Sequence, residues 1–338
     1  MPVRSDRALF LISANNNFLR THLTSYTYHL PHITNNLLLR AFAIMVAPQY
    51  YVFTGRAGGE VIPRHVTHVR IALALKFVRA RAFLNHPNIK KVICHDGVVK
   101  IEEKAFFKCP RLRRVIMPGV KVIGQMAFEG CKALRFVECG KLERIGYCAF
   151  RFCKSLRNVE LPSIKIVDGN AFERCKKLTR VNFGKDLKSI GGTAFCNCIS
   201  LERITIPLKD DIITSDSIFI GCKKLNHVDL VEGEHETIAA LLLEEWKNDM
   251  IGEIERINRV LPNTHAGTKR IGDMPGEKAR EIRTWIRSVR PKIIHYKAEH
   301  RRILNEAAAT LENDLPSDIV YKNVLPFLEL PLDTFERD

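Results

Sequence analysis

The chain has 338 residues, of which 46% are hydrophobic, and its 53 lysines and arginines outnumber its 37 acids to give a formal net charge of +16. This length allows a substantial core and fits one elongated domain with appendages. No segment approaches the run of about 18 apolar residues that a membrane-spanning helix needs, so the sequence predicts no membrane span.

The first 44 residues differ in composition from the rest of the chain. They are rich in Asn, Thr, Ser and Leu, and they carry four arginines against one acid, Asp6. This composition resembles an organellar transit peptide. We favour a disordered extension instead, or a misassigned start with Met45 as the true initiator. Residues 45–65 then form an N-terminal cap that leads into the next segment.

The central segment, residues 66–235, is an internal repeat. Phenylalanines recur at spacings of 22 to 24 residues, at Phe83, Phe106, Phe128, Phe150, Phe172, Phe195 and Phe219. In the last six units a cysteine follows three positions later, at Cys109, Cys131, Cys153, Cys175, Cys198 and Cys222. Self-similarity at such a period indicates a solenoid, whose units bury their apolar sides by stacking on one another.

Each unit has a strand-like part and a turn-like part. The stretch from Leu156 to Leu161 alternates apolar and polar residues, which is typical of a short strand. Equivalent strands of successive units would pair in parallel. The Ala-Phe-x-x-Cys portion has near-helical spacing and predicts a single helical turn that directs the phenylalanine inward.

The repeat resembles the BspA-type leucine-rich repeat, whose units carry an I-G-x-x-A-F-x-x-C-x-x-L signature. Its Ile-Gly step is present here as Ile123-Gly124, Ile145-Gly146 and Ile190-Gly191. The resemblance implies a leucine-rich-repeat solenoid of short parallel β-strands with helical turns, in about seven units of 22–24 residues. It also implies a non-enzymatic scaffold for protein–protein interaction. The apolar, proline-punctuated residues 316–338 resemble a tail found in algal members of this repeat class.

The repeat cysteines are expected to be reduced. Cysteines stacked one strand apart lie at disulfide distance, but their side chains point the same way and not at each other. They are interpreted as small buried hydrophobes, which favours a cytoplasmic location, or an organelle if residues 1–44 are a transit peptide. No Cys-x-x-Cys pair and no histidine cluster is present, so we expect no metal and no other cofactor.

A basic ridge is predicted along the positions that follow the repeat cysteines. Residues 66–235 carry a net charge of +14, and equivalent repeat positions stack about 5 Å apart. Like charges at that spacing repel unless they are solvated or meet a counter-charge, so the ridge is a candidate surface for a polyanion or nucleic acid. A solvated ridge without a ligand is the alternative. The ridge consists of Arg111, Lys132, Lys154, Lys176, Lys177, Lys223 and Lys224.

The outward strand positions offer a second candidate surface. They vary between units while the core positions do not, which suits a specific protein partner. Ordinary surface is the alternative interpretation. The predicted contact patch consists of Phe136, Glu138, Asn158, Glu160 and Arg180.

After Glu234 the apolar period becomes helical. One long helix is expected over 237–260 and another over 277–315, with a Gly-, Asn- and Pro-rich linker at 262–276 and a kink at Pro291. These two helices of the 236–315 segment would pair as a hairpin, or associate between chains as a short coiled coil.

No catalytic motif accompanies these segments. The glycine-rich stretch from Gly55 to Gly59 lacks the Lys-Ser/Thr of a phosphate-binding loop. His235-Glu236 has no second histidine four residues later, and no G-x-S-x-G elbow is present. The sequence therefore predicts a protein that is not an enzyme.

Overall fold

The structure is a computed structural model that describes residues 50–55, 60–267, 276–320 and 322. These residues belong to one compact unit, Tyr50–Asp338. The predicted extension at residues 1–44 and most of the tail at 316–338 lie outside the described residues.

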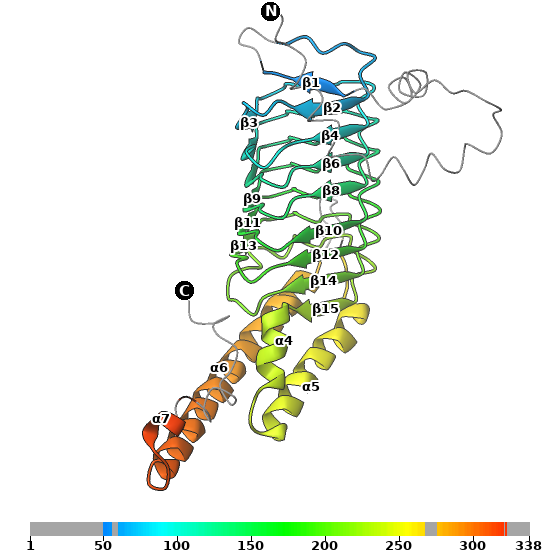
Figure 1. Ribbon diagram of the computed structural model, residues 1–338. Coiled ribbons are helices and arrows are strands. Elements are labelled where there is room, and N and C mark those ends of the chain that lie inside the picture. Colours follow the sequence, from blue (N-terminus) through cyan, green and yellow to red (C-terminus); the bar gives the residue numbers. More distant parts are fainter. Residues whose placement is uncertain (1–49, 56–59, 268–275, 321, 323–338) are drawn as a thin grey trace, which may run out of the picture. The chain divides into compact units, whose positions relative to one another are not determined.

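The repeats form a stacked series of coils with parallel strands on two sides (Figure 1). One side carries the longer strands, which we call the long sheet: β1 (Tyr51–Phe53), β2 (His68–Ile71), β4 (Lys91–Ile93), β6 (Arg114–Ile116), β8 (Phe136–Glu138), β10 (Asn158–Leu161), β12 (Arg180–Phe183), β14 (Arg203–Ile206) and β15 (His227–Leu230). The expected solenoid of parallel strands is therefore confirmed.

A second side carries two-residue strands that form one continuous sheet in the order β13-β11-β9-β7-β5-β3. We call it the short sheet: β3 (Phe77–Val78), β5 (Lys100–Ile101), β7 (Val122–Ile123), β9 (Arg144–Ile145), β11 (Ile166–Val167) and β13 (Ser189–Ile190). From β3 to β14 each coil thus contributes one short and one long strand, and the short strands of neighbouring coils are all hydrogen-bonded.

The Ala-Phe segments form the third side as tight turns. Their N–H groups bond forward to the next coil, as in Phe106 N–H to Ala127 C=O at 2.8 Å. Residues such as Met126, Cys148 and Asn170 have φ near +55°, which an α-helical turn does not contain. The spacing that suggested a helical turn therefore belongs to a sequence of hydrogen-bonded turns.

The core is a stack of identical side chains. Between Phe106 and Phe195 the ring centroids of neighbouring coils lie 5.2 Å apart, with interplanar angles of 3° to 8°. Each repeat cysteine donates its S–H to the carbonyl of the phenylalanine one coil earlier, as in Cys131 Sγ to Phe106 O at 3.1 Å. All ten cysteines are buried and free, so the prediction that the ladder is reduced agrees with the structure.

The C-terminal segment contains more helices than predicted. The elements are α4 (Glu232–Ala239), α5 (Glu244–Val260), η2 (Leu261–Asn263), α6 (Lys278–Leu311) and α7 (Ser317–Ile319). The single helix predicted over 237–260 is wrong, because the chain leaves the helical conformation at its apolar run. There the Leu242 N–H bonds to His300 Nδ1 on α6 at 3.2 Å, and Leu243 is extended. The second helix continues through Pro291.

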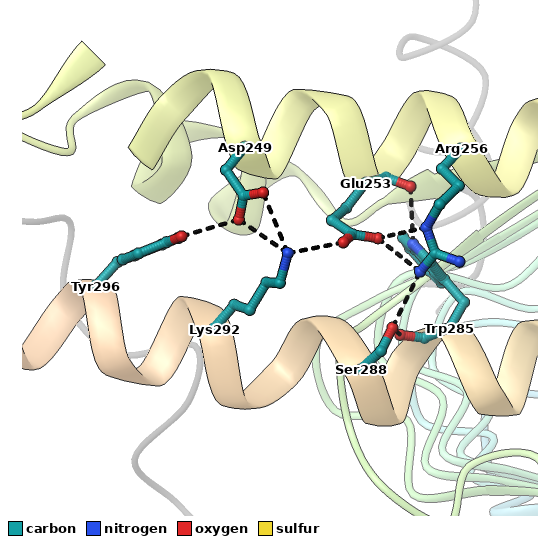
Figure 2. Close-up of polar contacts among 7 residues, drawn as sticks. All are labelled: Asp249, Glu253, Arg256, Trp285, Ser288, Lys292 and Tyr296. Atoms are coloured by element: carbon teal, nitrogen blue, oxygen red, sulfur yellow. Dashed lines mark hydrogen bonds and ion pairs between the residues drawn. The ribbon is translucent and has the colours of Figure 1, made fainter. Parts of the chain in front are cut away.

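Helices α5 and α6 pack against each other within the chain through a polar network (Figure 2). Lys292 donates to Asp249 at 3.1 Å and to Glu253 at 2.8 Å, and the Tyr296 hydroxyl donates to Asp249 at 2.8 Å. The Trp285 indole donates to the Glu253 carbonyl at 2.9 Å. Two acids of α5 are therefore neutralised and oriented by donors of α6.

These helices close the last coil of the solenoid. The Asn258 side chain accepts the Val228 N–H at 2.8 Å and donates to the Val228 C=O at 3.2 Å, so one amide pairs both backbone groups of Val228 on the outer edge of β15. The buried Lys278 ammonium donates to the carbonyls of Leu225 and Leu261 at 2.8 and 2.6 Å. An edge strand that would otherwise remain open is thereby covered.

Candidate functional site

The outward side of the long sheet presents two rows of side chains. Strand pairing places His68, Lys91 and Arg114 opposite one another, and it does the same for Arg180, Arg203 and His227 further along. Strands β2, β4, β6, β12 and β14 thus each present an arginine or a lysine, whereas β8 and β10 present none. The middle of the face therefore differs in charge from both flanks.

The predicted contact patch lies on this middle section. Phe136 and Glu138 project from β8, Asn158 and Glu160 from β10, and Arg180 from β12, and all five are exposed. The Phe136 side chain is exposed to 57%. The structure thus brings the five residues together on three successive strands.

The long sheet is broken between β8 and β10. Hydrogen bonding joins the strands in two groups, β1-β2-β4-β6-β8 and β10-β12-β14-β15, and Figure 1 shows a wider step between the two. Val137 is partly exposed, although the equivalent Val115 and Val159 are buried. The same two coils remain joined by β7 and β9 and by Phe128 and Phe150, whose rings are 5.2 Å apart. The break is therefore confined to the long sheet.

Two carboxylates occupy the same repeat position on either side of the break. Glu138 pairs with Arg114 on β6, whereas Glu160 accepts the Asn182 amide on β12 at 2.9 and 3.1 Å. Each acid therefore bonds away from the break, as expected when like charges lie on adjacent strands.

A groove continues from Glu160 toward the start of α4. Its lining includes the acids Glu160, Glu232 and Glu236 and a single lysine, Lys185. The acids of α4 were missed by the sequence analysis, because only the fold brings the cap beside the face. A second groove between the sheet and α5 is lined by Arg180, Arg203, His227 and Asn258, among others.

The basic ridge residues are all exposed in the turns that precede the long strands. Arg111 donates to the Asn88 side chain at 2.7 Å, and Lys224 lies 3.5 Å from Glu202. Within the described part of the chain, the other five ridge lysines form no ion pair. The ridge therefore carries charge that the acids among the described residues do not neutralise.

Two buried groups that do not belong to the outward side of the long sheet have raised pKa values. Burial raises the pKa of the Cys139 thiol to about 12, so this cysteine is a poor nucleophile. Burial also raises the pKa of Glu234 to about 8, although its Oε1 accepts the Leu208 N–H at 2.7 Å. Glu234 lies in the first turn of α4 and belongs to the cap rather than to the face.

Among residues 50–55, 60–267, 276–320 and 322, no group of three or more His, Cys, Asp or Glu is arranged to hold a metal ion. Within those same ranges, none of the helices combines the length and the apolar character that crossing a bilayer requires.

Comparison with known proteins agrees with the fold. The BspA type leucine rich repeat region matches residues 64–157 and 143–245 in six copies, which together span more than half of the chain. None of the curated proteins matches.

Similar solved structures come from bacteria. The T. pallidum leucine rich repeat protein is 31% identical over 41% of this chain and 68% of its own, with a TM-score of 0.38. A leucine-rich repeat protein from Eubacterium ventriosum is 26% identical over 47% and 40%, with a TM-score of 0.39. One from Bacteroides ovatus is 22% identical over 50% and 56%, with a TM-score of 0.33. With the family's repeat matched across the whole solenoid, this chain belongs to the BspA type leucine-rich-repeat family.

Proposed function

We propose that the protein is a non-catalytic scaffold that binds a protein partner through the outward side of the long sheet. The contact would centre on the patch of Phe136, Glu138, Asn158, Glu160 and Arg180. The leucine-rich-repeat family is in general one of protein-interaction scaffolds, which supports the class of function. The choice of surface comes from this chain's own residues.

The observation that carries the proposal is the exposure of Phe136. A phenylalanine exposed to 57% leaves apolar area in water, and it does so beside polar residues that could orient a partner. Aromatic side chains surrounded by polar groups are typical anchors of protein interfaces. In this respect β8 differs from β6 and β10, whose equivalent positions hold Arg114 and Asn158.

The test is site-specific photo-crosslinking in the full-length protein. A photoreactive phenylalanine analogue at position 136 should crosslink a partner in host cells, and one at Lys247, on α5, should not. The crosslink should disappear when Arg180→Glu is added. Absence of any crosslink at 136, or equal crosslinking at both positions, would refute this surface.

The alternative is that a polyanion or nucleic acid binds the basic ridge. It is favoured by the exposed lysines that lack acidic partners within the described residues, among them Lys132, Lys154 and Lys176. Heparin and single-stranded RNA would be titrated at two salt concentrations against wild type and the triple change of these lysines to Glu. Binding that weakens steeply with salt and is lost in the variant supports the ridge, because each neutralised phosphate releases counterions. No binding at low salt rules it out.

A further inference from the structure

The break between β8 and β10 leaves two strand edges in the middle of a continuous solenoid. Every other pair of adjacent strands from β1 to β15 on the long sheet is hydrogen-bonded, but these two are not. Unpaired edges expose carbonyl and N–H groups that a partner can bind. This feature adds hydrogen-bonding groups to the surface on which Phe136 is exposed.

The chemistry around the break is that of an acceptor site. Glu138 and Glu160 contribute carboxylates, Asn158 contributes an amide, and the outward positions of β8 and β10 contain no cation. The groove that begins at Glu160 adds two further acids from α4 and one lysine. The lining of this groove thus carries more acids than cations, although the repeats as a whole are strongly basic and Arg114 pairs with Glu138 beside the break.

The arrangement also favours a planar cation over a compact one. Phe136 is exposed on the same face of β8 as Glu138, two residues later, and Glu160 lies on the next strand of the long sheet. A guanidinium can stack on an aromatic ring while it donates to acceptors in its plane. A lysine ammonium has three donors but lacks the planar surface for stacking. Glu138 and Glu160 each retain acceptor capacity, because a carboxylate offers about four lone-pair sites.

We propose that the break binds an arginine side chain presented by an extended, basic segment of a protein partner, with the rest of that segment lying along the groove toward α4. This inference rests on the proposed function and assigns the chemistry of the partner. The guanidinium stacks on Phe136 and donates to Glu138 and Glu160. Further basic residues of the segment meet Glu232 and Glu236.

The test uses the full-length protein and a fluorescent heptapeptide, Ser-Gly-Arg-Gly-Arg-Gly-Ser, followed by fluorescence anisotropy. Matched peptides carry lysine or glutamate in place of arginine. The protein variants are the double change Glu138→Gln with Glu160→Gln, and the single change Phe136→Ala. The control is Glu244→Gln with Glu255→Gln, which removes the same charge from exposed positions of α5.

The double variant should weaken the arginine peptide at least tenfold and the control by less than twofold. Phe136→Ala should weaken the arginine peptide several-fold but leave the lysine peptide nearly unchanged, because only arginine stacks. Equal loss in the control would show non-specific attraction, and tighter binding of the glutamate peptide would show an acidic partner. Either outcome, or no binding of the arginine peptide, overturns the proposal. Circular dichroism and thermal melting confirm that each variant is folded.

The two proposals can fail separately. If a partner crosslinks at position 136 but its capture is unaffected by the double glutamine variant, the surface stands and the arginine assignment falls. If the peptide binds at the break but no partner crosslinks there, the chemistry of the break stands and the proposed scaffold surface falls.

Discussion

The cap of the solenoid should weaken as pH rises, because of one buried carboxyl group. Glu234 is 1% exposed, and burial raises its pKa from 4.5 to about 8. The folded protein therefore holds a proton between these values that the unfolded chain has released. Stability is fully present below pH 4.5 and falls as pH rises through about 8, by roughly 1.4 kcal/mol per pH unit. The whole window amounts to about 5 kcal/mol, which is comparable to the total stability of many domains.

Glu234→Gln removes this dependence, since glutamine resembles the protonated acid and keeps an acceptor for the Leu208 N–H. Urea unfolding of wild type and variant at half-unit steps from pH 5 to 9 measures the difference in unfolding free energy. The variant should be similar near pH 5 and more stable by several kcal/mol near pH 9. His68 and His86, whose pKa values are lowered chiefly by burial, are present in both proteins, so their contributions cancel in the difference. Parallel curves for the two proteins would refute the reasoning.

Three further predictions concern the edge, the core and the thiols. Asn258→Ala leaves the Val228 N–H and C=O unpaired and should lower the free energy of unfolding in urea by about 3 kcal/mol. The control Arg259→Ala, at an exposed neighbouring position, should lower it by less than about 0.5 kcal/mol. Equal losses would refute the edge-capping role of Asn258. Phe150→Ala opens a gap in the aromatic stack and should lower the free energy of unfolding by about 4 kcal/mol in the same measurement. A loss below about 1 kcal/mol would contradict tight stacking. A thiol reagent should label none of the ten cysteines rapidly in the native protein and all ten in denaturant, and fast native labelling would show that the ladder is accessible.

The repeat period predicted the architecture because every coil of the solenoid uses the same core positions at the same spacing. Each Phe and Cys position in the sequence maps to the same place in every coil, so spacing alone identifies the core. The turn conformation was not accessible in this way. Met126 and Cys148 adopt positive φ while their N–H groups bond to the neighbouring coil, and their identities do not indicate this conformation.

The C-terminal helices show where periodicity misleads. Leu241 to Leu243 continue the helical apolar pattern, yet Leu242 gives its N–H to His300 on another helix. A residue 58 positions away thus competes with the local helix, and no window of sequence contains both partners. The paired bonds of Asn258 to β15 were hidden for the same reason.

The sequence contains one irregularity at the position of the broken sheet, and the repeat pattern alone does not take it into account. Glu138 and Glu160 hold the same outward position in adjacent units, so two acids are neighbours in this row of the long sheet. Stacked acids predict repulsion on that side of the solenoid. Lys91 and Arg114, and likewise Arg180 and Arg203, are like-charged neighbours on strands that remain paired, so the stacked acids mark the break but do not by themselves explain it.

The break is tolerated because each coil is held on three sides. Losing a few ladder bonds costs roughly 1 kcal/mol each, and these groups can bond to water at the surface. The short sheet and the Phe128–Phe150 stack cross the same interface without a change in spacing. Stability in a solenoid is close to a sum over neighbouring interfaces, so one interface can be weak on one side while the array stays folded. Departures from a protein's own local rules tend to occur at functional sites. Here the departure coincides with an exposed phenylalanine and with two outward carboxylates, and these features meet on β8 and β10.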